Sequence, residues 1–406
     1  MLLMQRNNLK SSLCSILVLL CLLTVVRNQT QNFFKSGSLV NNKNKNIIPF
    51  ELRGHKIYVK IKLNDQPRSY NFILDTGAFT SIDKELAEEL NLSKGTSLST
   101  SDMIINAYML REDITLRLHD FVVKDFKMAA LDFSYFKEVD PDIDGFLGAN
   151  FLRFFNILID YQQKQLILSL SSHKKYTSNE EYIIKLDTQN LACLPKVDCQ
   201  VNHYYTGKAL IDTGSPFTII FPLSFLSKFS YSEQKKFIES KGVFVRWPWT
   251  SIEKNYIGRI DELRLGNLKL QNIPVIFANT EDIILGKEFL SQCITIIDYP
   301  GQQLIIKPYN KFSFRDNYFT IGLQLYKNKQ NRTFVEAIWR GSPADQAGID
   351  IDDEILKINS RDTKSLSLQE ISNILNNNRI PRIEIVNKKS YSERTIVLKK
   401  EALLPL

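Results

Sequence analysis

Two aspartates with matching surroundings are the residues of this chain most able to do chemistry. Asp75 and Asp212 each end an apolar stretch and are followed by threonine and glycine, in the runs Phe-Ile-Leu-Asp-Thr-Gly-Ala and Ala-Leu-Ile-Asp-Thr-Gly-Ser. Two carboxyl groups in contact cannot both ionise, because the charge of one raises the pKa of the other, so the pair keeps one shared proton. The ionised member can act as a general base on water while the protonated member acts as an acid. Brought into contact by the fold, such a pair could hydrolyse a bond with water, without a metal, a cofactor or a covalent intermediate.

The surroundings of the two aspartates recur along a long duplicated segment. The aspartates are 137 residues apart, which is the difference between positions 212 and 75. Phe-Leu-Gly at 146–148 corresponds to Ile-Leu-Gly at 284–286, and Ile-Asp-Tyr at 159–161 recurs at 297–299, both with an offset of 138. Three blocks in register indicate a duplicated domain rather than a chance motif.

This duplicated pattern resembles the single-chain aspartic proteases, in which retroviral-protease-like lobes are fused in tandem as in pepsin. The resemblance covers roughly residues 45 to 308. It implies a mainly β, bilobal pepsin-like fold with two closed, barrel-like lobes, at 45–170 and 182–308. It also implies that Asp75 and Asp212 are the catalytic pair, that an apolar-apolar-Gly segment crosses beneath each of them, and that the substrates are polypeptides.

The resemblance further assigns supporting roles to the residues beside the aspartates. Thr76 and Thr213 would each reach across to the backbone of the opposite lobe and lock the two halves together. Gly77 and Gly214 permit a tight turn, in which the glycine amide approaches the carboxylates and can donate to them.

The residue after each glycine differs between the two copies. Ser215 carries a hydroxyl that can donate to the Asp212 carboxylate and favour its ionised form, whereas Ala78 offers no such donor to Asp75. We therefore expect an asymmetric pair, which titrates higher than a pair with two donors and remains active toward neutral pH.

A third unit follows the duplicated segment and is predicted at residues 312–400. It resembles a PDZ domain: Ile321, Gly322 and Leu323 match the loop whose backbone amides receive a peptide C-terminus, and a second helix is expected at about 368–376. A short helix between Ser342 and Gly348 has good caps at both ends. The alternative is a PDZ fold that serves only as a packing or regulatory module. Residues 311–317 are expected to be a tether, so that this unit could be removed without loss of the protease.

The first thirty residues are predicted to be a signal peptide or an N-terminal anchor. The apolar run at 13–26 follows Arg6 and Lys10 and is short for a membrane span. No clear cleavage site follows it, so a membrane tether through this run remains open. Either reading predicts an exported protein, which is periplasmic, membrane-anchored or secreted. Cys193 and Cys199 flank a short loop and could form a disulfide in such a compartment. Together with His203 they could instead suggest a metal site, but no fourth ligand stands at a suitable spacing.

Three other segments bear on the organisation of the chain. Residues 31–45 are polar and are expected to be a flexible leader, and 93–102 lies where this family has a hairpin that covers the substrate. The second lobe carries an insertion at 229–256, which contains Trp-Pro-Trp at 247–249. The formal net charge is +8, but basic and acidic residues are interleaved, which favours a solvated surface over a nucleic-acid partner.

The leading functional hypothesis is an exported aspartic endopeptidase whose PDZ domain recruits or gates its substrates. One alternative is a catalytically silent scaffold that binds peptides, although both Asp-Thr-Gly copies are present. Another is a self-processing protease with a narrow substrate range. Activity on unrelated peptides would separate the first hypothesis from the other two.

Overall fold

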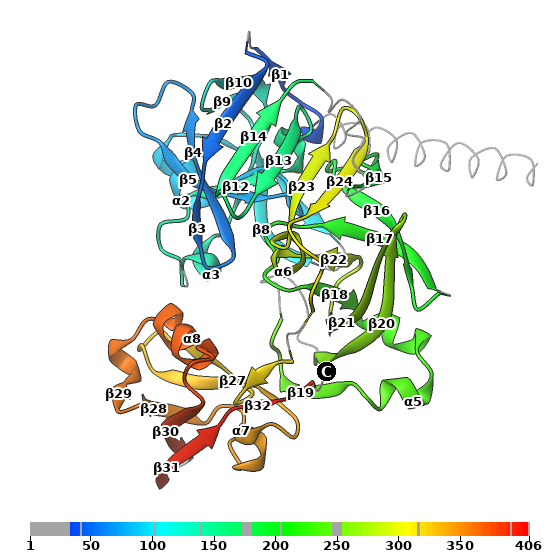
Figure 1. The fold of residues 1–406 in the computed structure, drawn as a ribbon. Coiled ribbons are helices and arrows are strands. Elements are labelled where there is room, and N and C mark those ends of the chain that lie inside the picture. The colour runs from blue at the N-terminus through cyan, green and yellow to red at the C-terminus, as the bar shows by residue number, and fades with distance from the viewer. Residues whose placement is uncertain are drawn as a thin grey trace, which may run out of the picture.

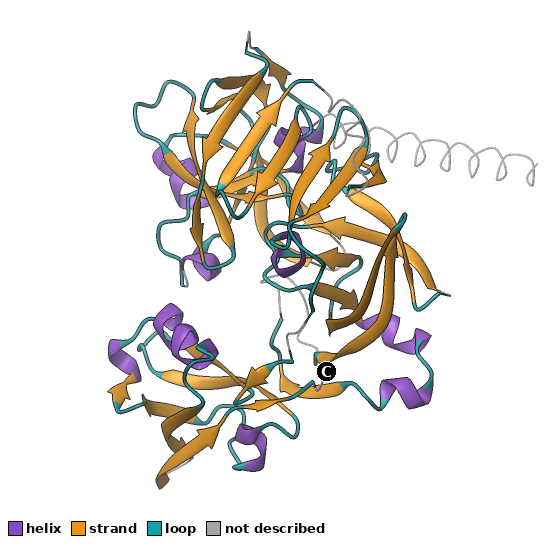
Figure 2. Ribbon diagram, viewed as in Figure 1, coloured by secondary structure: helices purple, strands orange, loops and turns teal. Residues whose placement is uncertain are grey.

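The computed structural model describes residues 33–40, 43–100, 103–138, 140–171, 181–203, 205–245, 254–314, 317–389 and 392–404. The predicted signal segment at 1–30 and the tryptophans at 247 and 249 lie outside the described residues. The described chain forms two β lobes and a C-terminal unit (Figures 1 and 2). The prediction of a mainly β fold with two lobes and a following C-terminal unit is confirmed.

The first lobe is built from short strands that alternate in burial. In β4, for example, Ile61 and Leu63 are buried, while Lys60 and Lys62 between and beside them are exposed. The elements of this lobe are β1 (Ser38–Leu39), β2 (Lys45–Pro49), β3 (Glu51–Arg53), β4 (Lys56–Leu63), β5 (Tyr70–Asp75), β6 (Ser81–Asp83), α2 (Lys84–Glu89), β7 (Lys94–Thr100), β8 (Met103–Leu110), β9 (Ile114–Leu118), β10 (Phe121–Phe126), β11 (Ala129–Leu131), α3 (Ser134–Lys137), β12 (Gly145–Gly148), α4 (Ala149–Leu152), β13 (Asn156–Asp160) and β14 (Gln165–Ser169).

The second lobe repeats this plan. β17 lies parallel to β22, as β5 lies parallel to β12 in the first lobe. Its elements are β15 (Tyr182–Asp187), β16 (Lys196–Val201), β17 (Tyr205–Ile211), β18 (Ile219–Pro222), η1 (Leu223–Lys228), α5 (Tyr231–Gln234), β19 (Ile238–Gly242), β20 (Tyr256–Leu265), β21 (Leu268–Ala278), β22 (Ile283–Leu285), α6 (Lys287–Leu290), β23 (Cys293–Asp298) and β24 (Gln303–Pro308).

A sheet shared by both lobes joins them in the order β2-β14-β13-β23-β24-β15. At its centre Leu158 of β13 pairs with Ile296 of β23 in antiparallel register. These two residues are 138 positions apart, which is the offset of the duplication. A residue that pairs with its own counterpart marks a twofold axis, so the lobes are related by a pseudo-twofold axis at this pair.

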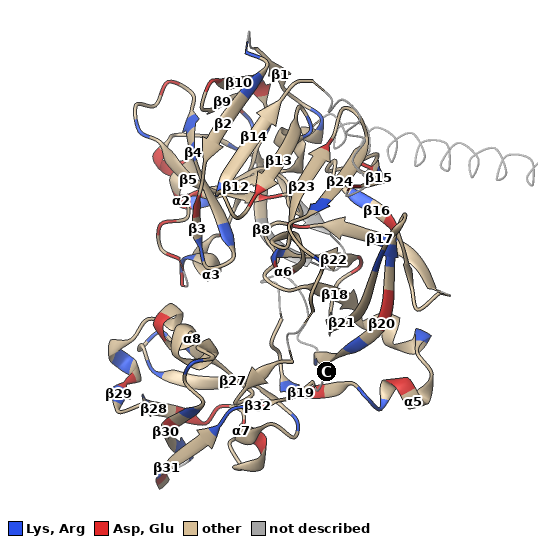
Figure 3. Ribbon diagram, viewed as in Figure 1, with Lys and Arg blue, Asp and Glu red and all other residues tan. Residues whose placement is uncertain are grey.

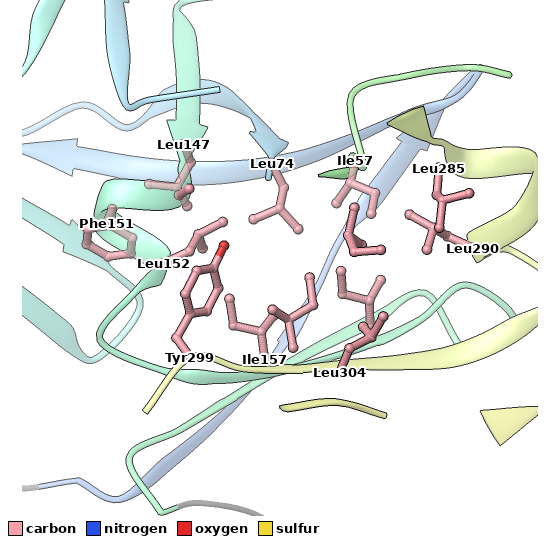
Figure 4. Packing of buried hydrophobic residues seen from close by; sticks show 14 of the residues in the cluster. Ile57, Leu74, Leu147, Phe151, Leu152, Ile157, Leu285, Leu290, Tyr299 and Leu304 are labelled. Atoms are coloured by element: carbon pink, nitrogen blue, oxygen red, sulfur yellow. The ribbon is translucent and has the colours of Figure 1, made fainter. Parts of the chain in front are cut away.

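One continuous apolar core connects the lobes above this sheet. Leu74 and Leu147 come from the first lobe and Leu285 and Leu290 from the second, and all four pack in the same cluster (Figure 4). Ile157 from the shared sheet belongs to the cluster as well. The residue immediately before each site aspartate is therefore anchored in this core, since Ile211 is also a member.

The C-terminal unit has its own core of buried aliphatic residues on strands and helices. Its second helix begins with a capping box, in which the Ser367 hydroxyl accepts from the Glu370 amide at 3.2 Å and the Glu370 carboxylate accepts from the Ser367 amide at 2.8 Å. The elements are β25 (Phe319–Thr320), β26 (Leu323–Lys327), β27 (Thr333–Trp339), α7 (Pro343–Gln346), β28 (Glu354–Ile358), β29 (Arg361–Asp362), η2 (Thr363–Ser365), α8 (Leu368–Asn376), β30 (Arg382–Lys389), β31 (Ser392–Lys399) and β32 (Glu401–Ala402).

Two predictions about linkers are wrong. The described part of the expected leader is packed: Phe33 and Phe34 are buried, and β1 pairs with β10. The expected tether also contacts the protease, because Phe312 stacks on Phe289 and the Arg259 side chain donates to the Phe314 carbonyl at 3.1 Å. In both segments phenylalanines bind to the lobes although the surrounding sequence is polar.

Within the described residues, no helix is long and apolar enough to cross a membrane. Figure 3 shows basic and acidic residues interspersed over both lobes and the C-terminal unit.

Candidate active site

The two Asp-Thr-Gly turns meet where the lobes face each other. Asp75 is the last residue of β5, and Asp212 directly follows β17. Beside β5 the parallel strand β12 pairs Gly148 with Asp75, and β22 takes the same place beside β17. The apolar-apolar-Gly segments therefore lie next to the aspartate strands, as the resemblance implies.

Each glycine of the motif packs against the aspartate of the opposite lobe. A Cβ atom built on Gly77 would lie 2.5 Å from Cγ of Asp212, and one on Gly214 would lie 2.6 Å from Cγ of Asp75. Only glycine leaves room for such an approach. The two carboxyl groups are consequently held close together.

Backbone amides also hold the carboxylates in place. The Gly77 amide donates to Oδ1 of Asp75 at 2.9 Å, and the Gly214 amide donates to Oδ1 of Asp212 at 2.8 Å. The Ser215 amide adds a third bond to Asp212 at 3.2 Å. Each aspartate is half-buried, so the pair remains open to a substrate.

The two threonines cross between the lobes. The Thr76 hydroxyl donates to the Ile211 carbonyl at 2.6 Å and accepts from the Thr213 amide at 3.0 Å. The Thr213 hydroxyl reciprocates by donating to the Leu74 carbonyl at 2.8 Å and accepting from the Thr76 amide at 3.1 Å. Both threonines are fully buried. They lock the two turns together, as expected from the resemblance.

This lock gives a stability prediction. We expect Thr76→Val to lower the free energy of unfolding by about 2–4 kcal/mol, because two buried backbone groups lose their partner. Urea denaturation followed by circular dichroism measures the change. Thr333→Val is a matched control, since Thr333 is as buried but its hydroxyl makes no hydrogen bond within the described chain. Equal costs for the two variants would mean that the crossing bonds contribute little.

Desolvation and mutual repulsion control the titration of the pair. Desolvation raises the pKa of Asp75 well above its ordinary value, and the neighbouring Asp212 charge and hydrogen bond raise it further. Desolvation also raises the pKa of Asp212, against the lowering effect of the Gly214 and Ser215 amides and of the Asp75 hydrogen bond. The pair therefore retains a shared proton above the pH at which an exposed aspartate ionises.

One explanation of asymmetry from the sequence is wrong. The Ser215 hydroxyl makes no hydrogen bond within the described chain and does not donate to Asp212. The Ser215 backbone amide makes the contact instead, and the Ala78 amide likewise lowers the pKa of Asp75. Because a main-chain amide is present at both positions, the Ala-to-Ser difference does not supply the asymmetry.

The raised pKa values predict how stability depends on pH. Between the unfolded pKa near 3.8 and the raised folded pKa, the folded state binds more protons than the unfolded state, so stability falls as pH rises through this window. Asp75→Asn removes the repulsion. We therefore expect its gain in unfolding free energy over the wild type to grow from pH 4 upward and to approach zero below pH 4. Urea midpoints across this range test the trend, and the exposed Asp198→Asn is the control.

Other predicted features fall near the site or separate from it. β7 and β8 form an antiparallel hairpin in the region expected to cover the substrate.

Ile321, Gly322 and Leu323 lie on the C-terminal unit, where the Gly322 amide donates to the Thr320 hydroxyl at 3.0 Å. Cys193, Cys199 and Cys293 are buried free thiols, and no metal-binding cluster of acidic residues, histidines and cysteines occurs among the described residues.

Comparisons with known proteins agree with this geometry. A family model described as aspartyl protease matches the chain twice, at residues 59–151 and 197–289, and a PDZ domain model matches residues 334–387. The chain carries two aspartyl protease domains in tandem and a C-terminal PDZ domain. The two protease matches are offset by 138 residues, like the duplication itself.

Other comparisons add less to the description of this two-lobed protease. No curated protein matches the chain. Among solved structures, the basic 7S globulin from soybean is similar over 66% of this chain and 95% of its own, with 10% sequence identity and a TM-score of 0.39.

One contact between the second lobe and the C-terminal domain was missed by sequence reasoning. The insertion at 229–256 was noted for its tryptophans, but its described part contains α5 and also β19, which pairs with β27 of the PDZ domain (Figure 1). The only signal for this contact is Trp339, a large apolar residue at the end of a PDZ strand, and the sequence does not indicate its partner.

Proposed function

We propose that this protein is an aspartic endopeptidase in which Asp75 and Asp212 activate water for peptide-bond hydrolysis. The observation that carries the proposal is the reciprocal packing of each carboxyl group against the glycine of the opposite lobe. It supports a pair that shares one proton, because the two groups are too close to ionise together.

In the proposed reaction, the ionised aspartate removes a proton from water as the oxygen attacks the peptide carbonyl. The protonated aspartate donates to the carbonyl oxygen, so the tetrahedral intermediate is neutral. On collapse the C–N bond breaks, the leaving nitrogen takes the proton that the pair received from water, and one hydroxyl of the intermediate returns its proton to the other carboxylate. The pair again holds one proton. No residue is modified and no metal is used.

Apolar clusters on both lobes support a polypeptide substrate with apolar side chains. Side chains two residues apart on a strand share a face, so Ile73 lies on the face of Asp75, and Leu210 lies on that of Asp212. Ile73 belongs to a cluster on which Ala78, Phe79 and the partly buried Phe136 also pack. We propose that this first-lobe cluster receives an apolar substrate residue beside the scissile bond.

The PDZ domain supports a second part of the proposal, capture of a peptide C-terminus. A ligand carboxylate would bind the amides of Ile321, Gly322 and Leu323 and replace the Thr320 hydroxyl at Gly322. The peptide would extend beside β26, next to α8. We also propose that the protein is exported and that residues 13–26 direct or tether it.

A peptide-hydrolysis assay tests the main proposal. The purified full-length protein is incubated with a library of unrelated peptides, with and without pepstatin, a transition-state mimic of aspartic proteases. Cleavage of several peptides that pepstatin blocks supports a general endopeptidase. Cleavage of its own chain alone would favour the self-processing alternative. No cleavage at any pH between 3 and 8 would leave a silent scaffold.

A further inference from the structure

The PDZ domain is joined to the second lobe through main-chain pairing. β19 lies antiparallel to β27, with Ser240 opposite Trp339 and Gly242 opposite Ala337. β27 also pairs with β26, and both pairings include Ala337 and Ile338, so β19 extends the PDZ sheet by one strand (Figure 1). A domain held by a shared sheet has a fixed orientation relative to its partner.

Polar contacts reinforce this junction. The Arg340 side chain bonds Glu239 at 2.6 Å, and the Arg340 amide donates to the Glu239 carbonyl at 3.0 Å. Lys241 pairs with Asp345 at 2.8 Å. These side chains are partly exposed, so their main effect is to set the register rather than to add much stability.

Trp339 brings the PDZ domain into contact with the apolar interior of the second lobe. Its ring stacks on Phe244 with a centroid distance of 4.0 Å and an interplanar angle of 3°, and its exposed fraction is 3%. It belongs to the same buried cluster as Leu210 and Ile284. Leu210 lies two residues before Asp212, and Ile284 lies on the strand that runs beside it.

The first lobe provides a useful comparison. There, Ile73 and Phe146 occupy the positions that correspond to Leu210 and Ile284, and their cluster is completed by residues of the same lobe. In the second lobe the equivalent cluster is completed from outside, by Trp339 and by Leu404 near the end of the described chain. The packing beside Asp212 therefore depends on the PDZ domain, whereas the packing beside Asp75 does not.

Trp339 also contacts the proposed peptide-binding loop. Its backbone amide donates to the Gly322 carbonyl at 3.0 Å. A peptide carboxylate bound by the amides of this loop would fix Gly322, and with it the main chain of Trp339. Trp339 is thus linked to the loop by one hydrogen bond and shares an apolar cluster with β17, the strand that directly precedes Asp212.

We propose that Trp339 is a positioning residue of the protease site, which transmits the binding of a peptide C-terminus at residues 321–323 to the strand before Asp212 and raises kcat. The proposal rests on the proposed endopeptidase function. A ligand shifts a protein toward the conformation that it binds more tightly, so the active arrangement must be the one that binds the peptide carboxylate more tightly.

The test uses the full-length protein and a short substrate with an amidated C-terminus, which the loop does not capture. A second, non-cleavable peptide is added with either a free or an amidated C-terminus. We expect the free-carboxylate peptide to raise kcat several-fold with little change in KM, and the amidated peptide to have no effect.

Variants then test whether Trp339 connects the peptide-binding loop to the strand before Asp212. Trp339→Ala should lower basal kcat about tenfold, shift the pH profile of kcat/KM and abolish the response to the peptide, whereas Trp339→Phe should keep the stack and the response. Val397→Ala, at an exposed position of β31 on the same domain, should behave as the wild type. If Trp339→Ala fails to fold, Phe244→Leu weakens the same stack from the protease side.

The outcomes separate this inference from the proposed function. Pepstatin-sensitive hydrolysis that the free-carboxylate peptide leaves unchanged, or slows, would overturn the inference and leave the endopeptidase intact. A folded Trp339→Ala variant with wild-type kcat, pH profile and peptide response would overturn it too. If the wild type hydrolyses no peptide, both proposals fail.

Discussion

Asp75→Asn and Asp212→Asn are each expected to lower kcat for peptide hydrolysis by about a thousandfold or more. Asparagine has nearly the shape of aspartate, so the contact with the opposite glycine is kept. It can neither accept the proton of the attacking water as a base nor deliver one as an acid. Because the pair works as a unit, the two single variants and the double variant should be similarly inactive.

The measurement is single-turnover hydrolysis of a peptide cleaved by the wild type, together with the urea midpoint of each variant. Asp198→Asn removes an exposed carboxylate of the second lobe and should retain full activity. A folded Asp75→Asn or Asp212→Asn protein with more than about a tenth of wild-type kcat would contradict the shared-proton mechanism. Activity retained by only one of them would point to a site built from a single lobe.

Ending the chain after residue 314 is expected to destabilise the second lobe and to reduce peptide hydrolysis at least about a hundredfold. This truncation keeps Phe312 and Phe314, which pack on the protease, but removes Trp339 and Leu404 from the cluster beside Asp212. Loss of one large buried side chain costs about 3–5 kcal/mol, and a folded domain has only about 5–15 kcal/mol in total. β19 also loses its partner strand and presents a free edge, which favours aggregation.

The truncated protein is compared with the full chain by urea denaturation, by size-exclusion chromatography and by kcat on a short amidated peptide. The short substrate excludes loss of recruitment as an explanation, since it makes no use of the PDZ loop. A control variant, Gly242→Val, leaves the chain complete but blocks the junction, because a Cβ at Gly242 would lie closer than 3.0 Å to the Glu336 carbonyl and φ is +71°. A truncated protein that is monomeric and fully active would contradict this prediction and would show that the PDZ domain is a removable module on a tether.

The sequence could predict the pair of aspartates because the motif around each of them is short and occurs twice. Asp75 and Asp212 end apolar strands in the same three-residue motif, and the second pair of blocks fixes the strands that run beside them. The first PDZ helix was predicted equally well, since its cap Ser342 is encoded within a few residues. The second, at 368–376, followed from the resemblance to a PDZ domain.

What the sequence could not predict are contacts between distant segments. Pairing of β19 with β27 joins residues about a hundred positions apart through main-chain atoms, which carry no residue-type signature. The packing of the leader was not predicted because only two phenylalanines, Phe33 and Phe34, bury it against the lobe in an otherwise polar segment. The prediction that the Ser215 hydroxyl donates to Asp212 was wrong for a different reason. Serine has a suitable donor, but the local backbone places its amide, rather than its hydroxyl, within hydrogen-bond distance of Asp212.

The pairing of Leu158 with Ile296 relates the two lobes by a pseudo-twofold axis, and this bears on how many accessory domains the protein carries. A symmetric dimer of identical lobes would carry every accessory element twice, and each copy would act on both halves of the catalytic pair alike. Joining the lobes in one chain releases each half from that constraint. In this chain one lobe completes its own packing beside its aspartate and the other is completed by a PDZ domain, so a single accessory domain packs beside only one of the two carboxyl groups.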